Sequence, residues 1–330
     1  MGTLIGHVAP GFAFFALGFW HLFNHIKLYS NQPNSYFSFP WFPTSRIRHL
    51  ELFLIMIASS LSIAMELFIG PQRHQPFDLD GTIPSNHLHN FEHATISLTF
   101  LTYAAFAIVL DRIGSKRTQQ QHSQLTQFIG SIAFAQQLLL FHLHSADHMG
   151  VEGQYHLLLQ LVILVSLTTT LLSIGHPRSF LVSFVRSASI LFQGAWLILM
   201  GYMLWTPGFI PKGCYINLEE GHQVVRCHGE KALHRAKSLV NLQFSWFLVG
   251  ITIFSVSFYL VWDNVFAGDH QKVEYSTLIT REEEEEEDDY DEDSDHHHPH
   301  HDVESQNIRG KFTGNMGGGG KFATIDNMER

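Results

Sequence analysis

Cysteine and charged residues are both scarce in this sequence. Two cysteines in 330 residues exclude a disulfide-dense scaffold and a zinc module built on cysteine ligands. Charged residues make up 15% of the chain, whereas soluble proteins carry about 25%. The formal net charge of −10 does not indicate an acidic globular protein, because acidic residues are concentrated after Gly268. We therefore expect an apolar membrane domain at residues 1–265 and a disordered, acidic and histidine-rich tail at residues 266–330.

Long apolar stretches, by contrast, are abundant. A helix needs about 20 residues to cross a bilayer. Seven stretches approach that length, and the first lacks the basic start and the cleavage site of a signal peptide. The sequence thus predicts an all-α fold, a seven-transmembrane helix bundle. We expect its spans at Leu4–Ile26, Leu50–Gly70, Leu88–Leu110, Leu125–Leu143, Tyr155–Ile174, Leu181–Trp205 and Leu239–Trp262.

Seven spans place the two ends of the chain on opposite sides of the membrane. We call the side of the N-terminus face A and the other side face B. The short connections on face B are rich in lysine and arginine, which marks that side as cytosolic. The N-terminus is then luminal or extracellular, and the acidic tail is cytosolic. The basic residues concerned are Lys27, Arg46, Arg48, Arg112, Lys116, Arg117 and Arg178.

Both cysteines, Cys214 and Cys227, fall in the long face A loop between the sixth and seventh spans. A luminal or extracellular compartment permits disulfide formation, and the loop between them is easy to close. The sequence leaves two states open, a disulfide or two free thiols.

Histidine is unusually frequent, with 23 residues. Three groups of histidine and acidic residues have i, i+3 or i, i+4 spacing, which places each group on one face of a helix. All three lie at span ends on face A, as do His7 and Glu66. The groups are His144, Asp147 and His148; His89, Glu92 and His93; and Glu152 with His156.

Ionisable groups inside a membrane are costly and usually face the interior of the bundle. Imidazole and carboxylate ligands suit a transition metal such as zinc or iron. We therefore hypothesise that this face A layer binds such a metal, with Glu92 and Glu152 as acid/base groups of an enzyme acting on lipid. Helix caps and headgroup anchors are the simpler alternative. The expected ligands are His7, Glu66, His89, His93, His144, Asp147, His148 and His156.

A smaller histidine cluster lies on face B. His21 and His25 have i, i+4 spacing at the end of the first span, and His49 opens the second. Histidine in both leaflets is typical of membrane cytochromes that hold two b-type haems, which gives an alternative function. Metal transport is less favoured, because the central turns of the spans hold no carboxylate.

The tail carries a possible sorting signal and a possible metal-binding tract. Tyr275–Leu278 fits a tyrosine-based sorting signal for adaptor proteins, and an acidic cluster follows it. The tract His296–His301 is of a kind that binds metal loosely.

Three segments of the sequence resemble one protein family. GHVAPGFAFFALGFWHLFNHIKLY, HNFEHAT and FHLHSADHMGVEGQYHLLL are similar to the transmembrane protein 45 family, above all its plant members, over most of residues 1–265. The resemblance implies a multi-pass protein of the endomembrane system or plasma membrane, with links to stress or pathogen response. It implies no catalytic residues. A metal-dependent enzyme, a haem electron carrier and a non-catalytic scaffold or trafficking protein all stay open.

Overall fold

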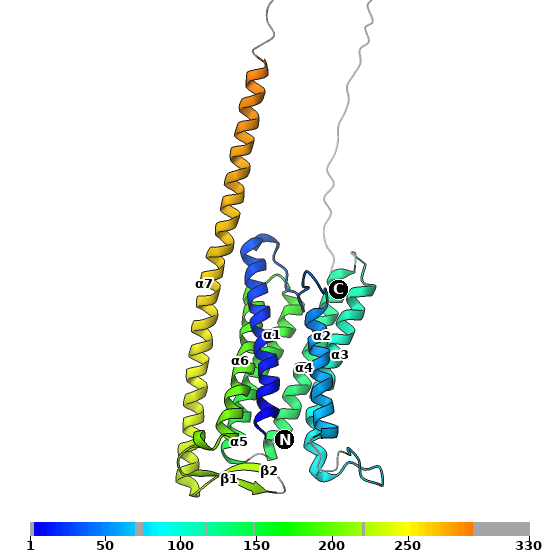
Figure 1. Ribbon diagram of the computed structural model, residues 1–330, viewed down its shortest axis with the longest axis vertical. Coiled ribbons are helices and arrows are strands. Elements are labelled where there is room, and N and C mark those ends of the chain that lie inside the picture. Colours follow the sequence, from blue (N-terminus) through cyan, green and yellow to red (C-terminus); the bar gives the residue numbers. More distant parts are fainter. Residues whose placement is uncertain (1–2, 70–74, 116–117, 148, 220–221, 293–330) are drawn as a thin grey trace, which may run out of the picture. The chain divides into compact units, whose positions relative to one another are not determined.

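A computed structural model describes residues 3–69, 75–115, 118–147, 149–219 and 222–292, and the side chains of all of these except residues 144–147, 222 and 266–292. This part of the chain is mostly helical, with one small pair of strands (Figure 1). The helices are α1 (Leu4–Asn31), α2 (Leu50–Ala64) with a π-helical turn at Met65–Ile69, α3 (Leu88–Ile113), α4 (Gln119–Asp147), α5 (Gly150–Gly175), α6 (Phe180–Trp205) and α7 (Gly229–Glu292). The strands are β1 (Cys214–Glu219) and β2 (His222–Cys227).

Six helices in the described residues are long and apolar enough to cross a membrane. They are α1, α2 with its π turn, α3, α5, α6 and the part of α7 that ends at Val265. The chain is thus a multi-pass membrane protein by length and composition. Helix α4 falls outside this group because its sequence is more polar, so the expected total of seven spans stays a prediction.

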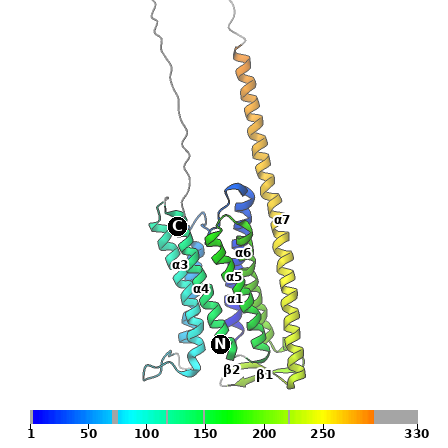
Figure 2. The same cartoon turned by 180° about the vertical axis from the view of Figure 1, so that it is seen from behind.

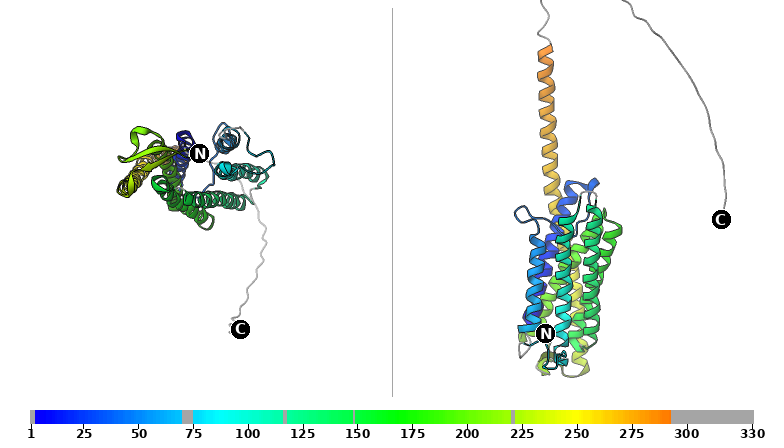
Figure 3. Two further views of the ribbon diagram at one scale, coloured as in Figure 1. Left: turned by 90° about the horizontal axis from the view of Figure 1, so that it is seen from below. Right: turned by 90° about the vertical axis from the view of Figure 1, so that its right-hand side faces the viewer.

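Helices α1 to α6 form a ring. Helix α1 packs against α6, and α5, α4, α3 and α2 follow in order (Figures 1 and 3). Hydrogen bonds from Trp20 and His21 of α1 to Glu51 of α2 join the two ends of the series. The order places the inner faces of helices distant in sequence around one shared interior.

The contact between α1 and α6 depends on glycine. A Cβ atom on Gly18 would meet the backbone of Leu191, and one on Gly194 would meet the backbone of Phe15. The two helices therefore approach more closely than any larger residue at these positions would permit.

Helix α7 packs on the outside of α6 through aromatic side chains. Phe244 lies 5.1 Å from Phe192 and 5.0 Å from Trp196, measured between ring centroids. The helix continues past the expected domain boundary at residue 265 and ends at Glu292. The chain divides into two compact units, Met1–Glu274 and Tyr275–Arg330. The expected disorder of the tail stays a prediction, and residues 293–330, with the tract His296–His301, lie outside the described residues.

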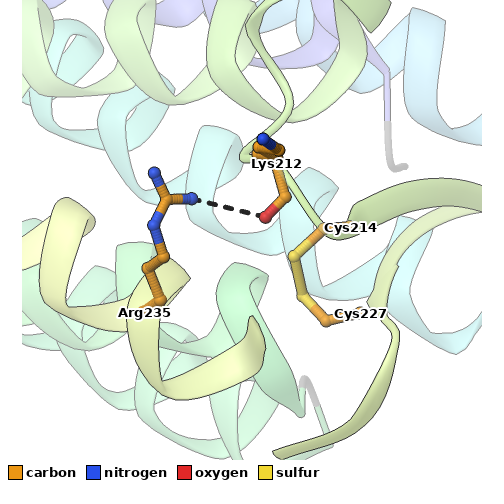
Figure 4. Close-up of a disulfide and its surroundings, with 4 residues drawn as sticks. All are labelled: Lys212, Cys214, Cys227 and Arg235. Atoms are coloured by element: carbon orange, nitrogen blue, oxygen red, sulfur yellow. Dashed lines mark hydrogen bonds between the residues drawn. A yellow bond between two sulfur atoms is a disulfide. The ribbon is translucent and has the colours of Figure 1, made fainter. Parts of the chain in front are cut away.

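The loop between α6 and α7 folds into an antiparallel hairpin, which corrects the all-α expectation. Cys214 pairs with Cys227 in the strand register, and the two form a disulfide (Figure 4). The sequence did not predict the strands, because each is short and no apolar stretch marks them. Arg235 of α7 donates a hydrogen bond to the Lys212 carbonyl at 3.4 Å, which ties the helix to the hairpin base. The sequence left open a disulfide or two free thiols, and the structure shows the disulfide.

Candidate functional site

Four ionisable side chains from four elements meet near the face A end of the ring. His7 comes from α1, Glu66 from the π turn after α2, His93 from α3 and His156 from α5. We call these four residues the face A cluster. His7, Glu66 and His156 are buried, and His93 is partly buried. The helix ring thus joins residues that the sequence separates by up to 149 positions.

Ring contacts and one contact between an imidazole and a carboxylate hold the cluster together. The rings of His7 and His156 lie 5.9 Å apart, edge to face, and His7 also stacks on Trp205 at 4.4 Å. His93 Nδ1 lies 3.4 Å from Glu66 Oε1. Phe141 of α4 links the two pairs, because its ring lies 5.8 Å from His156 and 6.5 Å from that of His93.

Backbone carbonyls fix the tautomer of two imidazoles. His7 Nδ1 lies 3.1 Å from the Thr3 carbonyl, and His156 Nδ1 lies 3.0 Å from the Glu152 carbonyl. A carbonyl only accepts hydrogen bonds, so Nδ1 carries the proton in each ring. In the neutral ring Nε2 then carries the lone pair, which is the tautomer found at many metal-ligating histidines.

Glu66 lies in the only π-helical turn of the described residues, Met65–Ile69. Such turns are rare and frequently occur at functional sites. The carboxylate accepts a hydrogen bond from Asn90 Nδ2 at 2.8 Å in addition to its contact with His93. The extra residue in the π turn and the amide of Asn90 together orient a buried carboxylate toward α3.

The other predicted ligands lie around this cluster. The His89 ring is 6.5 Å from that of His93, and Glu92 lines a small depression beside His93 and Phe141. Glu152 is buried in the first turn of α5. The side chains of His144, Asp147 and His148 lie outside the described residues. Within the described part of the chain, no group of three or more His, Cys, Asp or Glu side chains is arranged to hold a metal ion.

The face B histidines are each bonded to a side chain through Nε2. His21 Nε2 lies 2.7 Å from Glu51, and His49 Nε2 lies 2.8 Å from Asp111. His25 Nε2 lies 3.1 Å from the guanidinium of Arg186. Haem ligation by any of the three through Nε2 requires that its present contact break, so this geometry lends the haem alternative no support.

Arg186 is a functional candidate that the sequence reading missed. It is buried, and its guanidinium donates to Gln127 at 3.2 Å, Ser173 at 3.5 Å and the Phe39 carbonyl at 2.8 Å, besides His25. The signal was present in the sequence, since a single arginine interrupts an apolar span and such residues mark functional sites.

The arginine also sets the tautomer of His25. Arginine only donates hydrogen bonds, so His25 Nε2 accepts and Nδ1 carries the proton. That proton is donated to the Tyr36 hydroxyl oxygen, 2.9 Å away. Burial raises the pKa of Tyr36 to about 12, so the phenol stays neutral at physiological pH. The partners of the buried Arg186 guanidinium in this network are therefore neutral groups. The Glu51 carboxylate contacts the neighbouring His21 instead.

Part of the chain matches the model of a protein family. Residues 123–260 match the model of a family of unknown function, DUF716. The match covers less than half of the chain and runs from α4 into α7. It includes Phe141, His156 and Arg186, whereas His7, Glu66 and His93 lie before it. The finding agrees with a membrane family without an assigned activity.

Proposed function

We propose that the chain crosses the membrane seven times, with α4 as the seventh span. Helix α4 packs between α3 and α5, which are both apolar enough to span. Its polar residues Gln127, Ser131 and Gln137 are buried in the ring, which explains why its sequence reads as more polar than that of its neighbours. A helix whose polar residues face the interior can still present an apolar surface to lipid.

The same proposal includes the orientation and the family. The N-terminus and the hairpin lie outside the cytosol, which the Cys214–Cys227 disulfide supports because such bonds persist in oxidising compartments. The chain is a plant-type member of the transmembrane protein 45 family, located in the endomembrane system or plasma membrane. Sorting adaptors bind the tail at Tyr275–Leu278.

As the function we propose binding of a transition metal by the face A cluster, whose side chains would have to move closer together to hold the ion, since no group of three is arranged to do so in the described residues. The observation that carries it is the shared tautomer of His7 and His156, whose rings lie 5.9 Å apart and whose Nδ1 protons both bond to carbonyls. Glu66 and His93 add a carboxylate and a third imidazole from two more elements. Mixed imidazole and carboxylate donors suit zinc or iron.

Bound zinc or iron would supply Lewis-acid chemistry at this layer. Glu152 is buried one helical turn before His156, and Glu92 lies next to His93 in sequence. These positions are the support for proposing both residues as acid/base groups. The substrate class proposed is membrane lipid, since the ring is surrounded by it.

Metal content tests this function directly. Protein purified in detergent without a histidine tag, and with residues 296–301 deleted, is compared with a His7→Ala/His156→Ala variant. His234→Ala is the matched control, because that side chain is 81% exposed on α7. Near-stoichiometric metal in the parent and control, and its loss in the double variant, is the expected result.

Two outcomes contradict the proposal. Folded parent protein without metal refutes it, as does metal retained at full stoichiometry in the double variant. The visible spectrum of the same sample decides on haem, since a Soret band would favour the electron carrier. If the protein contains neither metal nor pigment, the remaining function is that of a non-catalytic scaffold.

A further inference from the structure

A groove runs between α4 and α5 on the outside of the ring (Figure 2 shows the two helices side by side). Its volume is about 460 Å³, within the range of sites that hold one small ligand. The lining residues are Ala135, Leu138, Leu139, His142, Gln160 and Leu167.

The walls of the groove are continuous with the lipid-facing surface. Leu139 is 52% exposed, and Leu164, which lies between the lining positions Gln160 and Leu167 in the sequence of α5, is 47% exposed. Helix α5 is apolar enough to span the membrane, so acyl chains surround this surface. An occupant of the groove therefore enters from the bilayer and presents an apolar body to the leucines.

One end of the groove is polar. His142 Nδ1 lies 3.1 Å from Gln160 Oε1, and Gln160 Nε2 donates to the Phe141 carbonyl at 3.3 Å. The His142 side chain is exposed toward the groove, whereas Gln160 is buried. None of the six lining residues is lysine, arginine, aspartate or glutamate. The polar end thus matches a neutral hydroxyl, and it offers no counter-charge to a phosphate.

We propose that this groove binds a neutral lipid of the sterol class, with its hydroxyl at His142 and Gln160 and its apolar body along Leu138, Leu139 and Leu167. The site lies outside the face A cluster and goes beyond the proposed metal function. Phe141 separates the two, because its carbonyl bonds to Gln160 while its ring contacts His156. Binding of the lipid does not depend on the metal.

Photolabelling of the full chain tests the site. The probes are a diazirine-bearing sterol and, in a separate arm, a diazirine-bearing phosphatidylcholine, both in phosphatidylcholine vesicles. Ala135→Phe fills the groove, and Ile132→Phe is the matched control one turn earlier on the exposed face of α4. The sterol label is expected on α4 and α5 peptides of the parent and the control, and to be lost in Ala135→Phe.

A second pair of variants tests the polar end. His142→Leu is expected to lower sterol labelling by about fivefold, the effect of one lost hydrogen bond. His234→Leu, an exposed position on α7, should leave it unchanged. Equal labelling by phosphatidylcholine, or sterol labelling that Ala135→Phe does not alter, overturns the proposal.

The metal content of Ala135→Phe separates this proposal from the previous one. We expect that content to equal the parent value, because the face A cluster is not part of the groove. Sterol labelling without bound metal refutes the metal function alone, and bound metal without labelling refutes the sterol site alone.

Discussion

His7 and His156 share a feature at the residue scale that spacing alone does not reveal. Each ring donates its Nδ1 proton to the carbonyl four residues earlier in the chain, that of the N-cap Thr3 for His7 and that of Glu152 for His156. The local backbone therefore sets both tautomers, and the packing of α6 against both α1 and α5 then brings the rings within contact. Arg186 follows a different rule, since its hydrogen bonds extend to three other elements and a loop.

Loss of Arg186 is expected to destabilise the ring. Arg186→Met leaves Gln127, His25 and the Phe39 carbonyl without their donor and leaves Glu51 without a nearby buried cation. We expect a loss of about 3 kcal/mol in the free energy of unfolding, the magnitude found when one partner of a buried charge network is removed. Arg186→Lys should recover little, because one ammonium cannot reach acceptors in several directions. Thermal unfolding in detergent measures both variants, and parental stability in Arg186→Met would refute the structural role.

At the scale of single elements, the sequence predicted the helices well and the hairpin not at all. The fourth span was expected at Leu125–Leu143, and α4 occupies Gln119–Asp147, because a helix continues beyond the apolar segment that hydropathy detects. The strands were not predicted because short amphipathic segments show little periodicity in their hydrophobic residues. The common side of His7, Glu66, His93 and His156 followed from topology. Their contacts through Phe141 and Trp205 did not, since these depend on the order of helices in the ring.

The glycine contact between α1 and α6 gives a prediction about these elements. Gly18→Ala places a Cβ atom against the Leu191 backbone, so we expect a loss of about 1–3 kcal/mol in the free energy of unfolding. Gly250→Ala on α7 is the matched control, because its Cβ would meet no atom within 4 Å. The control should be neutral or slightly stabilising, since alanine favours helix more than glycine does. Equal thermal stability of the two variants would show that the close approach is not needed.

The hairpin gives a prediction about pH. Hydrogen bonds from Arg226 and Asn217 hold the pKa of Glu219 at about 2, below its unfolded value of about 4.3. A lowered carboxyl pKa stabilises the hairpin above the unfolded pKa, and this contribution is lost as the pH falls through the range from about 4 to about 2. The effect on stability is small, because both side chains are more than a third exposed. Arg226→Gln should raise the pKa of Glu219 toward its usual range, and NMR titration of the carboxyl carbon checks this; an unchanged value would contradict the pairing.

At the scale of the whole molecule, the ring of α1 to α6 gathers polar side chains into two layers, one near each face. The face B layer is built around Arg186 and Glu51, and the face A cluster around His7 and His156. In the seven-span topology that we propose, the face A cluster and the hairpin lie on the same side of the membrane. The same proposal has the N-terminus and the tail on opposite sides.

Glycosylation mapping tests this topology. An Asn-Gly-Thr acceptor inserted in the loop after Trp205 should be glycosylated, which shows as a shift in mass that a glycosidase reverses. The same acceptor inserted between α5 and α6, at residues 176–179, should stay unmodified. The opposite pattern would invert the orientation, and modification at both sites would refute the span assignment.

The central claim is that imidazoles from separate helices bind one metal at face A. X-ray absorption at the edge of the bound metal, recorded on untagged protein with residues 296–301 deleted, tests it most directly. We predict nitrogen and oxygen neighbours, about 2.0–2.2 Å away if the metal is zinc, with imidazole scattering that disappears in the His7→Ala/His156→Ala variant. A spectrum with no imidazole contribution, or one that the double variant leaves unchanged, would contradict the account.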